Sequence, residues 1–324
     1  MAMKRSNRSG VFCLVLAAMS ALPASAQLRG EYSPGSYITG AGTVPDPGFS
    51  YQNQYWYNTA DRLYGPKGKL KNDDDGFYAL TDNNSFTFVP KAKLWGAKLV
   101  FMVDLAISSS RFVSIDAAVA KKKRDDIPLA PLAKPPVEVG AVGISDTNFV
   151  PFDLGWSFSR LDLQAGLSVY ATTGRYQPRA QDNLASGFWS IGPQAGATVY
   201  LTRNKSNQVS LYAYYAWNTH QQRTLNIPGQ DISFDYSLTH TFTFGKEGKW
   251  SVLAGPAGYG QWQTTANQRP DSLGNRYTID GVGFTTNLTT PYKGFYIGTS
   301  QLWEYDAKAT YEGRTSVITG GVNF

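Results

Sequence analysis

Few side chains in this sequence could carry out covalent chemistry. The chain has two histidines, His220 and His240, and one cysteine, Cys13. A histidine can activate a serine hydroxyl within hydrogen-bond reach. However, Phe242 stands two residues after His240, where the His-x-Ser pattern of lipid hydrolases needs a serine. We therefore expect His240 to be a neutral side chain bonded to a neighbouring strand, and we predict no catalytic residue.

Ligands for a metal ion are equally sparse. The run Asn72–Gly76 contains three consecutive aspartates, whereas a calcium loop alternates its acidic residues with other types. We interpret this run as a solvated loop. The chain has no clustered His/Glu spacing of the kind that holds zinc, so we predict neither a metal site nor a cofactor.

Polar side chains instead recur at every second position of long segments. Between Asp231 and Phe244, polar residues such as Asp235 alternate with apolar residues such as Phe234 and Phe242. Successive side chains of a strand point to opposite faces, so this segment has one polar face and one apolar face. A soluble sheet with a half-buried face would give the same alternation; the length and number of the segments decide between the two.

The alternation predicts about twelve strands, most of them ten or more residues long. Soluble strands average five or six residues, whereas about 9–11 tilted residues cross a bilayer. In the segment after Asp146, the pattern places Val150, Phe152 and Leu154 on the apolar face, opposite Asp153. The predicted strands lie near residues 51–57, 84–95, 97–109, 146–158, 160–172, 186–202, 207–219, 230–245, 248–264, 276–288, 292–306 and 312–324.

The connections between these strands alternate in length. The long ones fall near 58–83, 110–145, 173–185, 220–229 and 265–275, and the tight ones lie between them; the short connection near 307–311 is the exception. Short turns on one side and long loops on the other are typical of outer-membrane barrels. The sequence thus predicts an all-β fold, a transmembrane antiparallel up-and-down β-barrel of about twelve strands with short periplasmic turns and long extracellular loops.

The first residues have the pattern of a secretory signal. Lys4, Arg5 and Arg8 precede a short apolar stretch, and Ala24-Ser25-Ala26 is a small-residue cleavage site. We expect residues 1–26 to be a signal peptide and the protein to reach the bacterial outer membrane. Without this segment the balance of 30 basic and 24 acidic residues falls from +6 to 27 − 24 = +3. The basic balance is therefore no argument for nucleic-acid binding.

Two further features concern the ends of the predicted barrel. Residues 27–48 are rich in glycine and proline and form either a periplasmic tail or a plug inside the lumen, and 49–324 form the barrel. The last predicted strand ends on Phe324, and such a terminal aromatic predicts recognition by barrel-assembly machinery.

Several phrases of the sequence resemble one family, the SphA-like or "MetA-pathway of phenol degradation" outer-membrane proteins. The resemblance implies an outer-membrane β-barrel, often linked to the uptake of aromatic or other hydrophobic compounds. The matching phrases are Pro45–Phe49, Gly143–Asp146 with Leu154–Trp156, Thr173–Tyr176, Ile191–Pro193, Gly255–Tyr259 with Gln261, and Glu304 with Gly313 and the end Asn323-Phe324.

The polar faces of the strands supply candidates for a solute path. If the apolar faces contact lipid, the following residues line the lumen: Lys98, Asp104, Arg160, Asp162, Gln164, Gln194, Tyr212, Tyr214, Asp231, Asp235 and Glu304. A barrel of this size lies between the filled eight-stranded barrels and the open porins. The sequence leaves two functions open. One is passive diffusion of small hydrophobic or aromatic compounds, and the other is a non-conducting barrel whose loops bind lipopolysaccharide or a partner.

The basic run Lys121, Lys122, Lys123 and Arg124 in the long loop bears on the second function. It could bind lipopolysaccharide phosphates at the outer surface. Alternatively it is a charged loop tip balanced by Asp125 and Asp126.

Overall fold

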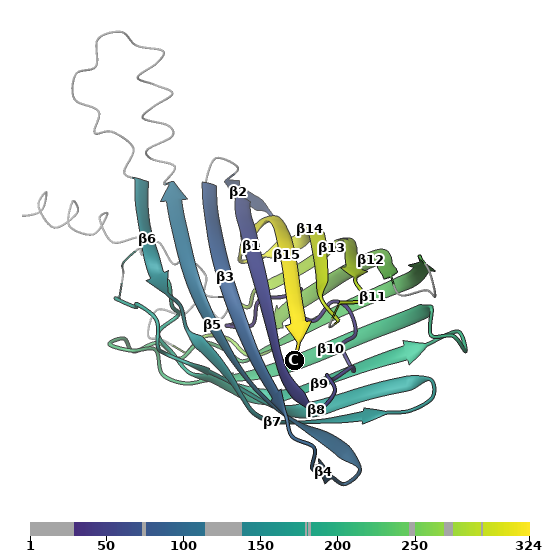
Figure 1. The fold of residues 1–324 in the computed structure, drawn as a ribbon. Coiled ribbons are helices and arrows are strands. Elements are labelled where there is room, and N and C mark those ends of the chain that lie inside the picture. Colours follow the sequence, from purple (N-terminus) through teal and green to yellow (C-terminus); the bar gives the residue numbers. More distant parts are fainter. Residues whose placement is uncertain are drawn as a thin grey trace, which may run out of the picture.

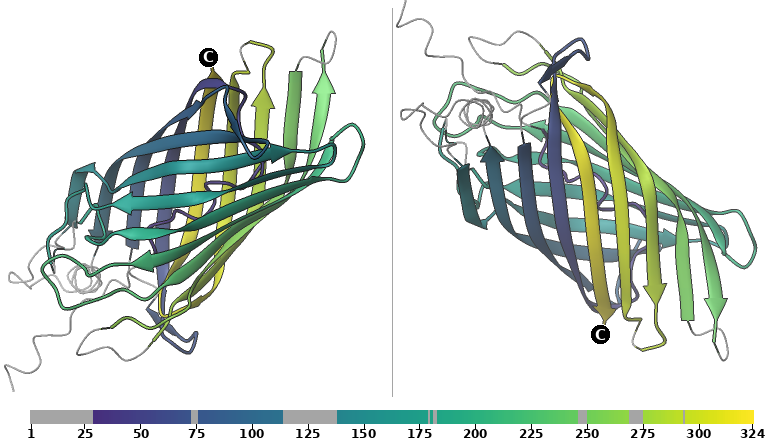
Figure 2. Two further views of the ribbon diagram at one scale, coloured as in Figure 1. Left: turned by 90° about the horizontal axis from the view of Figure 1, so that it is seen from below. Right: turned by 90° about the horizontal axis from the view of Figure 1, so that it is seen from above.

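Twelve long antiparallel strands form a closed barrel (Figures 1 and 2). The computed structural model describes residues 29–72, 76–113, 138–178, 180, 183–245, 250–268, 275–292 and 294–324. Pairing of the last strand with the first, from Ser50–Asn323 to Leu63–Tyr311, closes the sheet. Closure leaves no edge, and only such a sheet pairs every backbone group within lipid. The twelve strands are β1 (Gly48–Tyr64), β3 (Gly76–Val89), β5 (Ala97–Val113), β7 (Thr147–Ser157), β8 (Leu161–Ala171), β9 (Ser190–Tyr200), β10 (Asn207–Asn218), β11 (Asp231–Phe244), β12 (Trp250–Gln263), β13 (Thr278–Thr289), β14 (Tyr296–Lys308) and β15 (Tyr311–Asn323).

The predicted fold class is confirmed, and each predicted strand corresponds to one of these twelve. Several bounds were wrong, most of them because the sheet continues past the apolar stretches. β1 and β3 extend into the predicted loop 58–83, and the short β2 (Leu70–Asn72) pairs with β1. β6 (Glu138–Ile144) extends the sheet beside β5, within the predicted loop 110–145. Within the predicted strand 84–95, β3 ends before Pro90, and β4 (Lys93–Leu94) forms a small hairpin with the start of β5.

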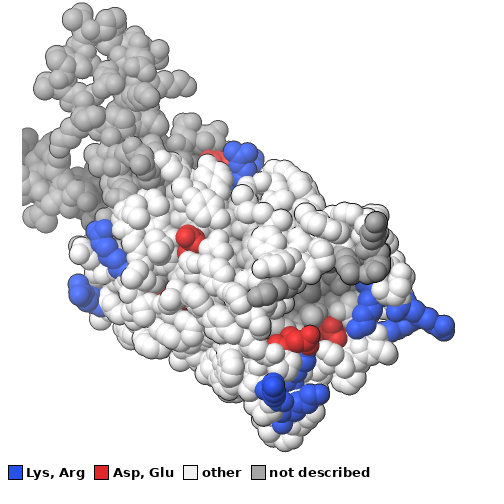
Figure 3. Space-filling view, viewed as in Figure 1, with Lys and Arg blue, Asp and Glu red and all other residues white. Residues whose placement is uncertain are grey.

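The distribution of exposed side chains is the reverse of that in a soluble protein. In β9 the polar Ser190, Gln194 and Thr198 are buried in the lumen, whereas Ile191 and Val199 are exposed on the outer wall. Figure 3 shows this wall as almost uncharged, with lysines and arginines mainly near its edges. Within the described part of the chain, no helix is long and apolar enough to cross a membrane.

One strand breaks the predicted alternation. The pairing of β7 with β8 shifts between Phe149 and Phe152, so a bulge falls around Pro151, which has no N–H to donate to the sheet. As a result Phe149 is exposed on the outer wall while Val150 is only 2% exposed and faces the lumen. The prediction that Val150 shares the lipid face with Phe152 was therefore wrong.

A polar cluster lies on the outer face of β1 and β3, among aromatic side chains. Asn53 Nδ2 donates to the Asp82 carboxylate and, at 3.3 Å, to Asn84 Oδ1. The Tyr51 hydroxyl also donates to Asn84 Oδ1, at 2.6 Å. These contacts satisfy polar groups at positions where the alternation alone predicts apolar residues.

Candidate functional site: the lumen

A cavity of about 2790 Å³ runs through the barrel. Its lining includes Pro66 and Lys71, just beyond the end of β1, and Ser50 and Asn323, at the opposite end of the same sheet. The cavity therefore extends along the whole length of β1.

The segment 29–47 also lies inside the barrel, where Figure 2 shows its trace crossing the lumen. At one end, Arg29 Nη1 donates to Glu304 Oε1 at 2.6 Å and Arg29 Nε to Thr310 Oγ1 at 3.2 Å, beside the β14–β15 turn. At the other end, Lys98 Nζ, at the start of β5, donates to the carbonyl of Pro45 at 3.1 Å. The turn and the start of β5 lie at opposite ends of the barrel, so the segment follows the full length of the lumen.

Asp235 is the main anchor of this segment. Its carboxylate accepts hydrogen bonds from the Tyr32 hydroxyl at 2.5 Å, the Gly35 N–H at 2.7 Å and the Tyr37 N–H at 2.9 Å. Asp235 is fully buried. A buried carboxylate is tolerated only when such donors replace water, so the segment and the wall depend on each other here.

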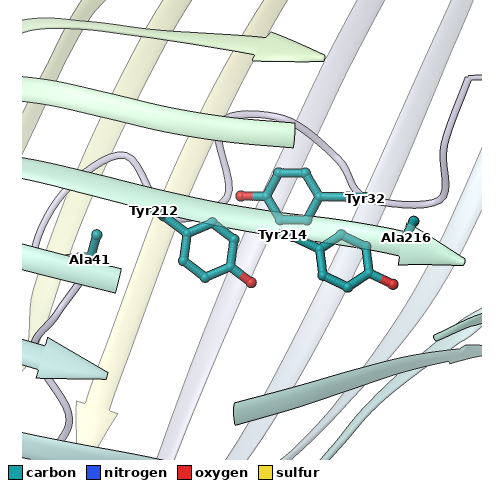
Figure 4. Packing of buried hydrophobic residues seen from close by; sticks show 5 residues of the cluster. All are labelled: Tyr32, Ala41, Tyr212, Tyr214 and Ala216. Carbon is teal, nitrogen blue, oxygen red and sulfur yellow. The ribbon is translucent and has the colours of Figure 1, made fainter. Parts of the chain in front are cut away.

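Tyrosine rings fill the space beside this anchor, as Figure 4 shows for Tyr32, Tyr212 and Tyr214. The Tyr32 ring lies 5.5 Å from that of Tyr212, and the Tyr37 ring stacks on Tyr212 at 4.4 Å. Stacked rings add to the free energy of burial. Side chains therefore fill this part of the lumen.

Glycines let the segment approach the strands backbone to backbone. A Cβ atom on Gly196 of β9 would lie 1.8 Å from the carbonyl oxygen of Ala41, and one on Gly42 would lie 2.1 Å from that of Asp162. Gly42 N donates to Thr198 Oγ1 at 3.0 Å. We call the lumen-facing side chains of β8 to β12, against which the segment packs, the packed wall.

Two carboxyl groups meet at the outer end of the segment. Asp146, between β6 and β7, accepts hydrogen bonds from the N–H groups of Gly174 and Ser186, at 3.1 and 3.0 Å. Glu31 lies beside it with one oxygen buried and without a hydrogen-bond partner in the described chain. Burial and the neighbouring charge of Asp146 raise the pKa of Glu31 well above its ordinary value, so this pair holds a proton more tightly than an isolated glutamate does.

The opposite side of the lumen has a different composition. We call the lumen-facing side chains of β13, β14, β15, β1 and β3 the neutral wall. Hydroxyl and amide groups dominate it, and among its described residues that line the cavity Glu304 is the only one with a charged group. Glu304 is already bound to Arg29, and it accepts a hydrogen bond from the Tyr259 hydroxyl at 2.7 Å.

The structure distributes the predicted lumen residues among four environments. Asp104, Gln164, Gln194 and Glu304 line the cavity. Asp162, Tyr212, Tyr214, Asp231 and Asp235 are buried in the packed wall, and Lys98 binds Asp46 of the segment at 2.8 Å. Arg160 is exposed in the turn between β7 and β8, which stops short of the lumen. The basic run Lys121–Arg124 lies outside the described residues.

Sequence reasoning missed several lumen groups. Asp153, which the alternation places on the polar face but which is not among the predicted lumen residues, accepts a 3.0 Å hydrogen bond from Gln194. Tyr259 and Gln261 of β12 are fully buried, and they alternate with Gly258 and Gly260, which give no apolar face to reveal the alternation. A strand search that treats glycine as neutral would have found them.

His240 is bonded to a neighbouring strand, as predicted. Its Nδ1 lies 2.7 Å from Asn207 Oδ1 on β10, and its ring contacts Phe242 edge-on. Within the described residues, no group of three or more His, Cys, Asp and Glu side chains is placed to hold a metal ion.

A closed twelve-stranded barrel with an apolar outer wall, and with a chain segment along its lumen, defines an outer-membrane β-barrel protein. The chain belongs to the family described as putative MetA-pathway of phenol degradation, whose model matches residues 60–318. This confirms the resemblance seen in the sequence.

Solved structures share the fold. An outer-membrane channel from Pseudomonas putida F1 superposes with a TM-score of 0.68 at 13% identity, covering 91% of this chain and 100% of that one. The β domain of the Bordetella autotransporter BrkA has a TM-score of 0.49 at 8% identity, covering 86% and 100%. Among curated proteins, none matches the chain in sequence.

Proposed function

We propose that this protein is a channel through which small hydrophobic or aromatic compounds diffuse passively across the outer membrane. The observation that carries the proposal is the cavity of about 2790 Å³, which extends along β1 beside the segment 29–47. Diffusion along it involves no chemical step and no cofactor. The family description, which refers to phenol degradation, and the Pseudomonas channel of similar fold support the proposal.

The segment 29–47 is the plug of this channel. It docks on the packed wall through Asp235 and the tyrosines, contacts the neutral wall at Glu304 and Gln54, and leaves hydroxyl and amide groups of the neutral wall lining the cavity. The cross-section available to a solute is therefore set by how closely the segment is held against the packed wall.

The alternative is a barrel that conducts nothing and binds lipopolysaccharide or a partner through its loops. The observation that favours it is the chain of hydrogen bonds from Arg29 to Pro45, which fixes the plug along the full lumen. Binding at the outer surface would then depend on loops such as the one that carries Lys121–Arg124.

Reconstitution of the full-length protein into lipid vesicles and planar bilayers separates the two functions. The channel function predicts single-channel currents and entry of small aromatic solutes at a rate proportional to the protein in the membrane. Absence of both current and solute entry, in vesicles where the barrel is shown to be folded by its resistance to protease, would exclude the channel and leave the surface-binding function.

A further inference from the structure

One row of side chains crosses the neutral wall from strand to strand, along the hydrogen-bonding direction of the sheet. Strand register pairs Asn83 with Gln54, Gln54 with Thr319, Thr319 with Gly298 and Gly298 with Asn287. All five residues line the cavity. We call this set the amide row, because three of its members carry side-chain amides.

Two side chains of the amide row are free to bind a ligand. Gln54 Nε2 donates to the carbonyl of Ser36 in the plug at 3.4 Å, so the plug contacts the neutral wall at Gln54. By contrast, no hydrogen bond within the described chain engages the side chains of Asn83 and Thr319. Gly298, between Thr319 and Asn287, contributes no side chain. An amide and a hydroxyl therefore face the cavity with their donors and acceptors available.

Aromatic rings flank the row on both sides. Trp56 lies two residues from Gln54 on β1, and Tyr296 lies two residues from Gly298 on β14; both line the cavity. The Tyr296 hydroxyl donates to Gln52 Oε1 at 2.6 Å, which fixes the position of this ring. Flat apolar groups thus border a strip of uncharged hydrogen-bonding groups.

The charged groups near the amide row determine which ligands it can bind. Glu304 on the neutral wall is neutralised by Arg29, and Asp104, on the adjoining β5, adds a carboxylate to the cavity lining. No lysine or arginine of the neutral wall lines the cavity in the described chain. An anion at the row would lose hydration without gaining a cationic partner, whereas a hydroxyl group can exchange hydrogen bonds to water for bonds to an amide at little cost.

We infer that the amide row, with Trp56 and Tyr296, is a binding site for an uncharged aromatic compound that carries a hydroxyl group. Its ring would lie against Trp56 with its hydroxyl bonded to Asn83, or against Tyr296 with its hydroxyl bonded to Thr319. A phenol is uncharged at neutral pH, because phenolic hydroxyls ionise near pH 10. The inference rests on the proposed function, since a solute reaches this site only through the channel.

Equilibrium dialysis of the full-length protein in detergent tests the site directly. Two probes share a phenol ring and differ in the group opposite its hydroxyl: 4-hydroxybenzyl alcohol is neutral at pH 7, and 4-hydroxybenzoate is an anion. Dialysis against empty micelles corrects for partition into detergent. The neutral probe should bind at least tenfold more tightly than the anion, and equal binding of the two would overturn the inference.

Neighbouring asparagines on β3 supply a matched pair of variants. Asn83→Leu combined with Thr319→Val removes the free hydrogen-bonding groups of the row and should weaken binding of the alcohol about tenfold. Asn84→Leu makes the same asparagine change on the outer face and should leave binding unchanged. Unaltered binding in the double variant would place the alcohol elsewhere and refute the site.

Flux into vesicles, measured in parallel, keeps the two proposals apart. Selective binding without flux would contradict the channel but support the site. Flux that is equal for both probes, with no selective binding, would support the channel and refute the site.

Discussion

The packed wall and the neutral wall face each other across one lumen, and both consist of polar side chains that alternate with apolar ones. Their polar groups have different partners. On the packed wall, Asp235 and Thr198 bind the plug and are fully buried. On the neutral wall, Asn83 and Thr319 line the cavity without a hydrogen-bond partner in the described chain. The same alternation in sequence thus serves as a docking surface on one side and, in the proposed channel, as a solute path on the other.

The two walls differ in function because they differ in charged groups and in glycines. The packed wall carries buried carboxylates, which require donors in a dry environment, and at Asp235 the backbone of the plug supplies two of these donors. It also has glycines such as Gly196, whose missing side chain lets the plug approach within contact distance. The neutral wall carries hydroxyls and amides, which water and uncharged solutes satisfy equally well.

The largest effect is expected from removing the anchor of the plug. Asp235→Ala leaves the N–H groups of Gly35 and Tyr37 without their acceptor, and each lost hydrogen bond costs about 1 kcal/mol or more. Backbone hydrogen exchange at Gly35 and Tyr37 should accelerate on the order of 100-fold, and single-channel conductance should rise. Asp235→Asn, which keeps an acceptor oxygen, serves as the control. Unchanged exchange in the alanine variant would show that the tyrosine packing alone holds the plug.

A smaller effect is expected from filling the space that the plug occupies. Gly196→Ala directs a methyl group at the carbonyl of Ala41 and should destabilise the docked plug by about 1–3 kcal/mol. Gly320→Ala on β15 is the matched change, because a Cβ there would meet nothing nearer than 3.7 Å. Urea unfolding from lipid vesicles should separate the two variants. Equal unfolding free energies would contradict the close approach of plug and wall.

Matched threonine variants compare the two walls directly. Thr198→Val leaves the buried Gly42 N–H unpaired, which should cost about 1–3 kcal/mol. Thr87→Val acts on a neutral-wall side chain that has no hydrogen-bond partner in the described chain, and it should change stability by less than about 0.5 kcal/mol. The same unfolding assay applies. A similar cost at both positions would mean that the neutral wall is as tightly packed as its counterpart.

The strands were predictable from sequence because the alternation of polar and apolar residues within each strand indicates which face is toward the lumen and which is toward lipid. The face of Asp231 and Asp235 opposite Phe234 and Phe242 is a local property, and lipid on one side makes it regular. The division of the lumen was not predictable, because it depends on where the plug docks. Nothing in the neighbourhood of Asp235 distinguishes a carboxylate that binds Gly35, 200 residues away, from one that faces water.

Local irregularities account for the remaining errors. Pro151 shifts the face of Val150 through a bulge, which a strict period of two cannot represent. The first part of β3, before residue 84, and the short β6 continue the sheet without apolar alternation. Only their hydrogen bonds to neighbouring strands mark them as strands, and that signal is not local in sequence.

The smallest effect is expected from pH at the outer end of the plug. Burial and the charge of Asp146 raise the pKa of Glu31, so docking favours its protonated form. By linkage, this contribution to docking is full at low pH and is lost as pH rises through the raised pKa of Glu31. Above it, two carboxylates repel each other beside a third, Asp231. Hydrogen exchange at residues 30–32 should therefore accelerate between mildly acidic and alkaline pH after correction for its intrinsic pH dependence. Glu31→Gln should remove this change, because an amide does not titrate. A wild-type profile that stays flat would mean that Glu31 and Asp146 do not share a proton, and that the plug is held by Asp235 and its tyrosines at every pH.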